Sequence, residues 1–201
     1  MDHAEQPFLY NWDESKHVGE CSLNENLTIR LSFDFNLDPF AVLVYQKPDN
    51  RSVRVVNLIK SSSDIEQVCD MILANYGRRR FMVTGDASGK SRTGVTRGKR
   101  SYWQAVKQNL DLADREIRLR SKNIDLLESR IICNSALKNC DILIDPSCTE
   151  LIHDCNYANV DYYGILIKDR NHNKMDFLDG FRYMIDAEFP DIVTRQEKYS
   201  R

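Results

Sequence analysis

The chain has 201 residues, of which 42% are apolar and 29% charged, and its formal net charge is -2. This length and composition fit one globular domain with its own core, and they exclude a disordered tail. No apolar run approaches the roughly 18 residues that a membrane-spanning helix requires. The first residues are acidic and polar, unlike a secretory signal, so we expect the chain to work in a cytoplasm.

Hydrophobic periodicity divides the chain into three parts. Residues 1–25 show no clear period and are expected to form an N-terminal extension or linker, with Trp12 as an anchor. Residues 26–190 carry regular patterns and are expected to form the folded domain. Residues 191–201 are expected to be a C-terminal tail.

The domain begins with three strand patterns. Residues 27–36 alternate between apolar and polar side chains, as a strand with one buried face does. Residues 40–46 are an almost continuous apolar run, and residues 53–60 read as a third strand after the turn KPDNR. Because only short turns join them, the three strands are predicted to form an antiparallel meander.

Helices and strands then alternate. Ser61 to Asp64 offer N-caps for a helix that runs to Tyr76 and ends at Gly77. Further strands are expected at residues 80–85, 116–120, 141–144 and 163–168, and further helices at 101–112, 124–138, 149–155 and 176–187. The sequence therefore predicts an α/β fold, in which a mixed β-sheet (the antiparallel three-strand meander plus parallel strands) is flanked by helices on both faces.

Three aspartates are candidates for chemistry, and the position of Asp34 needs an explanation. Asp34 lies inside the first strand, where a buried carboxylate is costly without a partner or a cation. Asp86 follows the fourth strand, and Asp179 lies in the last helix. For Asp34 the alternative is a turn or edge position that faces water.

The last helix has a polar stripe. Asp176, Asp179 and Tyr183 follow the spacing i, i+3, i+7 and are predicted to share one side of it. A solvated face is the simpler interpretation of such a stripe. However, Gly180 lies inside the helix, where glycine costs about 1 kcal/mol relative to alanine, which predicts close packing there.

If Asp34, Asp86 and Asp179 converge, their chemistry favours hard divalent cations. Carboxylate oxygens select Mg2+ or Mn2+ rather than Zn2+. Two such ions about 4 Å apart activate a water and stabilise the leaving oxygen of a phosphodiester. The predicted catalytic and metal-binding residues are therefore Asp34, Asp86 and Asp179, with Asp176 as a candidate fourth metal ligand.

The order of these features resembles the nuclease domain of phage large terminases, a family of the ribonuclease H-like superfamily. In that family an aspartate lies in the first strand, a second acid ends the fourth strand, and a helix with the pattern DA-x-RY supplies the third. Asp34 and Asp86 match the first two, and residues 179–183 (DGFRY) match the helix, with glycine in place of alanine. Residues 142–158 also resemble the stretch before that helix, so the resemblance covers residues 27–186.

The resemblance implies a ribonuclease H-like fold and a specific activity. It implies an Mg2+- or Mn2+-dependent endonuclease that cuts concatemeric viral DNA during genome packaging in the host cytoplasm. The implied partners are double-stranded DNA, a packaging ATPase domain, a small terminase and a portal. The chain has no Walker A motif of its own.

Positive charge gathers next to Asp86. Between residues 77 and 107 nine cations face one acid, and the predicted DNA-binding residues in this segment are Lys90, Arg92, Arg97, Lys99 and Arg100. A solvated charged loop is the alternative. Residues 85–91 (GDASGKS) resemble a phosphate loop, but they have three residues between the glycines where the motif needs four.

Other interpretations are weaker. Six cysteines without a CxxC pair are expected to be buried free thiols, and a zinc site from Cys148, His153 and Cys155 matches no common spacing. Another ribonuclease H-like nuclease, such as a junction resolvase or a transposase core, would also use such carboxylates to bind metal ions. A non-catalytic DNA-binding or packaging module that kept the fold is the alternative from another class.

Overall fold

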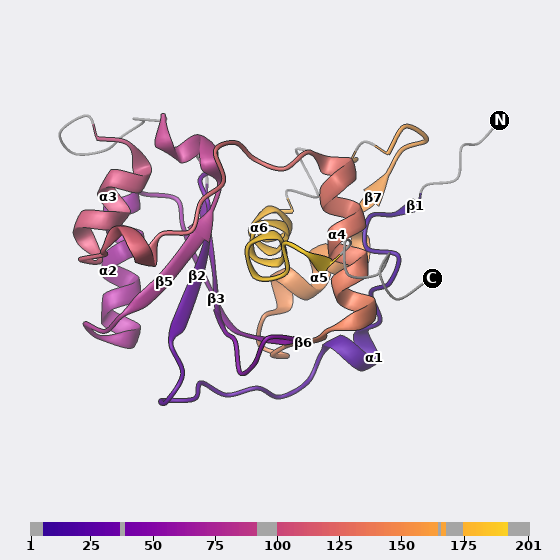
Figure 1. The fold of residues 1–201 in the computed structure, drawn as a ribbon, viewed down its shortest axis with the longest axis horizontal. Coiled ribbons are helices and arrows are strands. Elements are labelled where there is room, and N and C mark those ends of the chain that lie inside the picture. The colour runs from indigo at the N-terminus through magenta and orange to yellow at the C-terminus, as the bar shows by residue number, and fades with distance from the viewer. Residues whose placement is uncertain (1–5, 37–38, 92–99, 165, 168–174, 193–201) are drawn as a thin grey trace.

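The computed structural model describes residues 6–36, 39–91, 100–164, 166–167 and 175–192. Its centre is a five-stranded sheet in the order β5-β2-β3-β4-β6 (Figure 1). The strands are β2 (Ile29–Asp34), β3 (Phe40–Gln46), β4 (Ser52–Ser61), β5 (Phe81–Gly85) and β6 (Asp141–Ile144). The meander β2-β3-β4 is antiparallel, while β5 runs parallel to β2 and β6 parallel to β4. The predicted mixed sheet is therefore confirmed.

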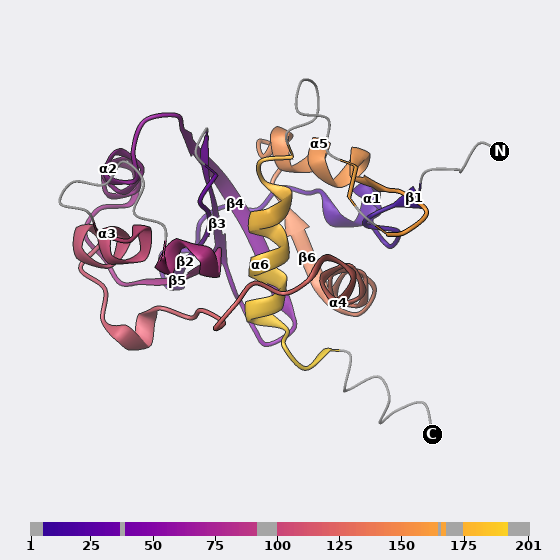
Figure 2. The same cartoon turned by 90° about the horizontal axis from the view of Figure 1, so that it is seen from above.

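Helices cover both faces of this sheet, as Figure 2 shows from above. One face carries α2 (Ile65–Tyr76) and α3 (Tyr102–Asn109), and the other carries α4 (Leu126–Asn139), α5 (Thr149–Tyr157) and α6 (Leu178–Glu188). The apolar run of β3 has a simple cause in this arrangement. Val42 and Val44 belong to the core under α2 and α3, whereas Leu43 and Tyr45 belong to the core under α4 and α6. A central strand that is buried on both faces needs apolar side chains at every position.

The helices begin where the sequence offers caps. The side chains of Asp64, Ser101 and Asp125 each accept a hydrogen bond from a backbone N–H of the first turn, in α2, α3 and α4 respectively. Gly77 ends α2 with a φ of 70°, a left-handed conformation that suits glycine. Among the described residues, none of the helices combines the length and the apolar character needed to cross a bilayer.

The first described residues pack against the rest of the chain. Strand β1 (Gln6–Pro7) pairs with β7 (Asn159–Val160), and Phe8 is fully buried in the core under α4 and α6. A short helix α1 (Glu14–His17) follows, and the ring of Trp12 stacks on His17 with 5.3 Å between centroids. Trp12 also donates from Nε1 to Asn156 at 2.8 Å. Trp12 thus joins this segment to α5.

The strand predicted at residues 116–120 is wrong. The chain forms a 3-10 turn, η2 (Asp114–Glu116), and then touches β5 through a single bridge between Ile117 and Val83. The buried Glu116 carboxylate accepts from Ala113 N at 2.8 Å and pairs with Arg80 at 2.7 Å. Residues 116–120 therefore do not form a strand ladder with β5.

The strand predicted at residues 163–168 also differs from the structure. Residues 165 and 168 lie outside the described residues. In the described part, Leu166 makes one isolated bridge to Val160 of β7. The expected helix at 176–187 begins two residues later, at Leu178, and extends to Glu188.

Candidate active site

Asp34 and Asp86 lie at the ends of two neighbouring parallel strands. Asp34 is the last residue of β2, and Asp86 follows the last residue of β5. Phe33 stands opposite Gly85 in the register, and Asp86 N donates to Phe33 O at 2.9 Å. Parallel strands present their carboxyl ends at one edge of a sheet. The fold therefore brings these two aspartates, each 4% exposed, side by side.

Strand alternation turns Asp34 toward α6. Phe33 and Phe35 pack into the core under α2 and α3, so Ser32 and Asp34 point to the opposite face. Ser32 confirms this direction, because its Oγ donates to the Gly180 carbonyl of α6 at 2.7 Å. A carboxylate in this strand therefore faces another element and not open water.

Gly180 lets α6 lie close to the sheet. A Cβ at this position would stand 2.6 Å from Leu43 Cδ1 and 3.6 Å from Ser32 O, which confirms the close packing that the sequence predicts there. Asp179 precedes Gly180 and is 9% exposed. The glycine thus sets the distance at which Asp179 stands from the strand that carries Asp34.

Two carboxylates fix the ends of α6. Phe177, at its N-cap, makes no capping bond, and Asp154 of α5 accepts from Phe177 N at 2.9 Å and Leu178 N at 3.2 Å instead. Burial raises the pKa of Asp154 to about 6, although these two hydrogen bonds lower it. At the other end Glu188 accepts from Tyr45 Oη at 2.9 Å and pairs with Arg30 at 2.8 Å.

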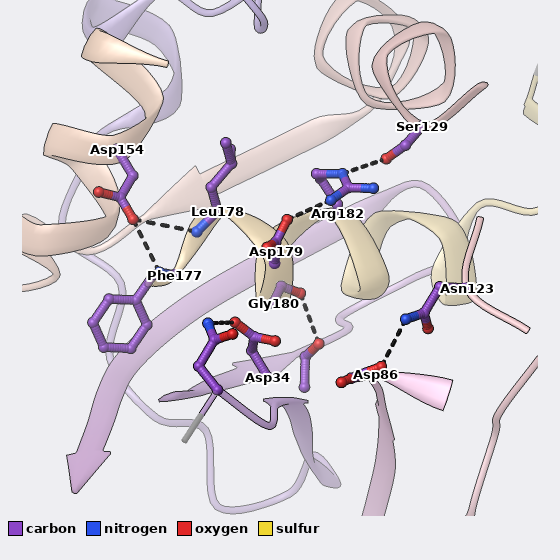
Figure 3. A network of polar contacts seen from close by, with 12 residues as sticks. Asp34, Asp86, Asn123, Ser129, Asp154, Phe177, Leu178, Asp179, Gly180 and Arg182 are labelled. Carbon is purple, nitrogen blue, oxygen red and sulfur yellow. Dashed lines mark hydrogen bonds and ion pairs between the residues drawn. The ribbon is translucent and has the colours of Figure 1, made fainter. Parts of the chain in front are cut away.

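Each of the three aspartates is held by a neighbouring side chain (Figure 3). Asp34 accepts from the amide of Asn36. Asp86 accepts from Asn123 Nδ2 at 2.6 Å, and from the N–H and Oγ of a serine, Ser88, at 2.8 and 2.7 Å.

Asp179 forms an ion pair with Arg182, one turn further along α6. Arg182 is 5% exposed, and its Nε donates to Ser129 Oγ on α4 at 2.8 Å. Figure 3 shows Arg182 bridging Asp179 and Ser129. Through Arg182, α4 therefore holds the carboxylate of Asp179 in place.

The pKa of the Tyr183 hydroxyl is affected by all three carboxylates. Burial raises the pKa of Tyr183 well above its ordinary value, and the negative charges of Asp179, Asp34 and Asp86 raise it further. In the described part of the chain, no three acidic, histidine or cysteine side chains stand close enough together to enclose a metal ion. The donor set of three carboxylates suits a hard divalent cation.

Asp176 does not share a helical stripe with Asp179, because it precedes the first residue of α6. The predicted stripe of Asp176, Asp179 and Tyr183 on one helix face is therefore wrong. The carboxylate of Asp176 pairs with Lys60 at 3.0 Å, and the same ammonium pairs with Glu150 at 2.8 Å. The side chain of Asp176 is thus directed to β4 and α5 by this ion pair.

The predicted DNA-binding residues fall into two groups. Arg92, Arg97 and Lys99 lie outside the described residues. Lys90 is exposed and donates from Nζ to the Arg120 carbonyl at 2.7 Å. Arg100 pairs with Glu66 of α2 at 3.2 Å and donates to Gln108 of α3.

The loop after β5 is not built to cradle phosphate with its backbone. Residues Ala87–Lys90 form a 3-10 turn, η1, and the Asp86 carboxylate already accepts from Ser88 N. Gly85, with a φ of 145°, would place a Cβ 2.1 Å from Phe33 O, so its role is close contact between strands. The glycines of this loop thus position Asp86.

Four cysteines behave as the sequence predicts. Cys69, Cys133, Cys148 and Cys155 are free thiols and are buried, whereas Cys21 and Cys140 are partly exposed. Burial raises the pKa of Cys148 to about 12, which disfavours the thiolate that zinc requires. His153 is exposed and packs on Tyr157, with 4.7 Å between ring centroids.

Asn123, Asp154, Ser129 and Lys60 are the residues that sequence reasoning missed. Each reaches the site from a distant segment: Asn123 precedes α4, Ser129 belongs to α4, Asp154 to α5 and Lys60 to β4. Their side chains act through one or two hydrogen bonds or ion pairs to distant residues, which leave no periodic pattern in the sequence. The helix pattern predicted at residues 124–138 does not predict that the residue just before it binds Asp86.

No protein-family model matches the chain, and no curated protein matches it either. Solved structures do. The large terminase of a thermophilic bacteriophage, in complex with ATP-gamma-S, superposes with a TM-score of 0.68 at 15% identity, over 92% of this chain and 46% of that chain. The P22 large terminase nuclease domain superposes with a TM-score of 0.60 at 12% identity, over 92% of this chain and 96% of that domain.

The large terminase nuclease domain from bacteriophage SPP1, solved with bound Mn, superposes with a TM-score of 0.52 at 16% identity. It matches over 87% of this chain and 96% of that domain. The chain thus has the fold of large terminase nuclease domains, which confirms the predicted ribonuclease H-like α/β architecture. It spans less than half the length of the large terminase from the thermophilic bacteriophage.

Proposed function

We propose that this chain is a metal-dependent DNA endonuclease of the terminase type, which cuts concatemeric viral DNA during genome packaging. One observation carries the proposal. Asp34 and Asp86 end adjacent parallel strands, and α6 brings Asp179 over the same edge through the contact of Gly180 with Ser32 and Leu43. Three buried carboxylates in one neighbourhood favour a divalent cation as their counter-charge.

In the proposed mechanism Asp34, Asp86 and Asp179 would hold two Mg2+ or Mn2+ ions, with Asp176 as a candidate fourth ligand. When bound, such ions supply a water nucleophile at neutral pH and offset the charge on the leaving oxygen. The chain's own contribution is to hold the three carboxylates in place. Asp176 contributes only if it turns away from Lys60, which now pairs with it at 3.0 Å.

The substrate of the proposed reaction is double-stranded DNA. Lys90 is exposed beside Asp86, and together with Arg92, Arg97, Lys99 and Arg100 we propose that it contacts phosphates. Arg100 would first have to leave Glu66. A packaging ATPase domain, a small terminase and a portal are the proposed partners, and the host cytoplasm is the proposed location.

Plasmid cutting tests the proposal. The protein is incubated with supercoiled plasmid in Mn2+, Mg2+ or EDTA, beside Asp86→Asn, which keeps the shape of the side chain and removes its charge. We expect cutting in Mn2+ or Mg2+ only. In the variant the cutting rate should fall by about 100-fold or more, where each tenfold corresponds to about 1.4 kcal/mol of activation free energy. Asp70→Asn, an exposed change on α2, is the matched control and should cut normally.

The other outcomes identify the alternatives. Cutting in EDTA, or full activity of Asp86→Asn, contradicts the metal mechanism. DNA binding without cutting under any metal supports a non-catalytic binding or packaging module. Preference for branched over linear duplexes supports another ribonuclease H-like nuclease, such as a junction resolvase or transposase-like enzyme.

A further inference from the structure

The segment between η2 and α4 lies beside Asp86 and is fixed there by four contacts, although it has no regular secondary structure. Arg118 N donates to Val83 O of β5 at 2.8 Å. Arg120 forms two hydrogen bonds to the Asp186 carboxylate of α6, at 2.5 and 2.6 Å, and its carbonyl accepts from Lys90. The fourth contact is made by Asn123. This segment is thus tied to β5, α6 and η1 at once.

Asn123 holds both the side chain and the backbone at Asp86. Its Nδ2 donates to Asp86 Oδ1 at 2.6 Å, and its Oδ1 accepts from Ala87 N at 2.6 Å. A backbone N–H can only donate and an ionised carboxylate can only accept. The two partners therefore fix which way the amide of Asn123 faces, and with it the direction of the Asp86 carboxylate (Figure 3).

The backbone of Asn123 is itself held on both sides. Upstream, Arg120 is held by Asp186. Downstream, Ile124 is buried in the core under α4 and α6, and Asp125 caps α4. An amide on such a fixed backbone loses little freedom when it binds Asp86.

A cavity of about 290 Å³ adjoins this contact and is lined by Asn123, Tyr183, Thr84, Gly85 and Asp186. Truncation of Asn123 would extend this cavity without a steric clash. Substitutions at Asn123 are therefore expected to change the hold on Asp86 more than the packing of the core.

We propose that Asn123 is a positioning residue of the acidic site, which orients the carboxylate of Asp86 for a divalent cation. This inference rests on the proposed function. Side chains that orient a metal ligand typically contribute about 10-fold to 100-fold in metal affinity. Asn123 orients Asp86 with a neutral donor, so it adds no positive charge to compete with the ion.

Calorimetric titration of Mn2+ into metal-free protein tests the inference without DNA. We expect Asn123→Ala to bind Mn2+ about 10-fold more weakly than the unsubstituted protein. Asn139→Ala, which removes an amide on α4 that bonds only its own helix carbonyl Ser135 O in the described contacts, is the matched control. Its Mn2+ affinity should not change.

A second variant separates positioning from a structural role. Asn123→Asp keeps the acceptor for Ala87 N but sets a carboxylate against that of Asp86. In EDTA it should melt at a lower temperature than Asn123→Ala because like charges repel, and saturating Mn2+ should raise its melting temperature by more. A purely structural role predicts the same Mn2+-dependent rise for both variants.

Kinetics give a further readout. For Asn123→Ala the Mn2+ concentration at half-maximal cutting should rise about 10-fold, while the rate at saturating Mn2+ changes little. Unchanged Mn2+ affinity in Asn123→Ala, beside normal binding by the unsubstituted protein, overturns the inference alone. Failure of the unsubstituted protein to bind Mn2+ or to cut DNA overturns the proposed function and the inference with it.

Discussion

Asp86 and Asp179 are held in opposite ways. Asp86, at the end of a strand, accepts hydrogen bonds from neutral groups, the amide of Asn123 and the N–H and hydroxyl of Ser88. Asp179, on a helix, pairs with the buried guanidinium of Arg182. Neutral donors orient a carboxylate and leave its charge in place, whereas a cation offsets the charge. In the described contacts, Asn123 and Ser88 thus orient Asp86, and Arg182 offsets the charge of Asp179.

The largest expected effect is on the helix side. Arg182→Met removes a buried cation and leaves Asp179 without that ion pair, so the free energy of unfolding should fall by about 3–5 kcal/mol. Urea denaturation in EDTA measures it. Arg182→Lys keeps the charge and should lose less. A loss below about 1 kcal/mol for Arg182→Met would contradict the role given to this pair.

The contact between α6 and the sheet comes next. In Gly180→Ala the new Cβ would meet Leu43 Cδ1 at 2.6 Å, and because Leu43 is fully buried the helix must shift. Overpacking of this kind costs about 1–3 kcal/mol, which exceeds the helix propensity that alanine gains. Urea denaturation should show a net loss, and Leu43→Val in the same chain should restore most of it. No rescue by the smaller side chain would refute the packing argument.

A smaller effect is expected at the start of α6. Asp154→Ala removes the carboxylate that caps Phe177 N and Leu178 N, and should lower the free energy of unfolding by about 1 kcal/mol. Asp154→Asn keeps an acceptor there and should lose less at neutral pH. Urea denaturation of both variants in EDTA measures the difference.

The same residue gives a pH dependence. Burial raises the pKa of Asp154 from 3.8 to about 6, so the folded state favours the protonated acid. The stability this provides is present below about pH 4 and is lost as the pH rises through about 6. Relative to Asp154→Asn, the unsubstituted protein should therefore lose stability between pH 4 and pH 7. A constant difference over this range would show that the pKa of Asp154 is not raised.

The smallest effect is expected at Ser88. Ser88→Ala removes the hydroxyl bond to Asp86 Oδ2 and keeps the backbone N–H bond to Oδ1. The free energy of unfolding should fall by about 0.5 kcal/mol, the lower end for a single hydrogen bond. Its Mn2+ affinity should fall less than that of Asn123→Ala, because Asn123 holds the backbone of Ala87 as well. The reverse order in calorimetry would move the orienting role from Asn123 to Ser88.

Most of the fold could be predicted from the sequence because each signal was local. Alternation predicted β2, the continuous apolar run predicted β3, and the cap at Asp64 predicted the start of α2. The strand predicted at residues 116–120 is wrong because these residues alternate like a strand but do not form a ladder. In the structure they make one bridge to β5, and the Glu116 carboxylate accepts from Ala113 N.

The candidate site was predictable in part. Asp34 lies in a strand pattern, where an acid is unfavourable, and Asp86 and Asp179 match the order of the family motifs. The glycine at position 180, where the family pattern has alanine, is explained only by the structure, since Leu43 fills the space. Asn123 and Asp154 could not be found, because the contacts that they make join segments 37 and 23 residues apart.

Diffraction from a crystal soaked in Mn2+, recorded with anomalous signal, tests the central claim most directly. We predict two manganese peaks within coordinating distance of the carboxylate oxygens of Asp34, Asp86 and Asp179, with Arg182 still anchored to Ser129. Saturating Mn2+ with no peak at these oxygens, in protein that cuts DNA, would contradict the account.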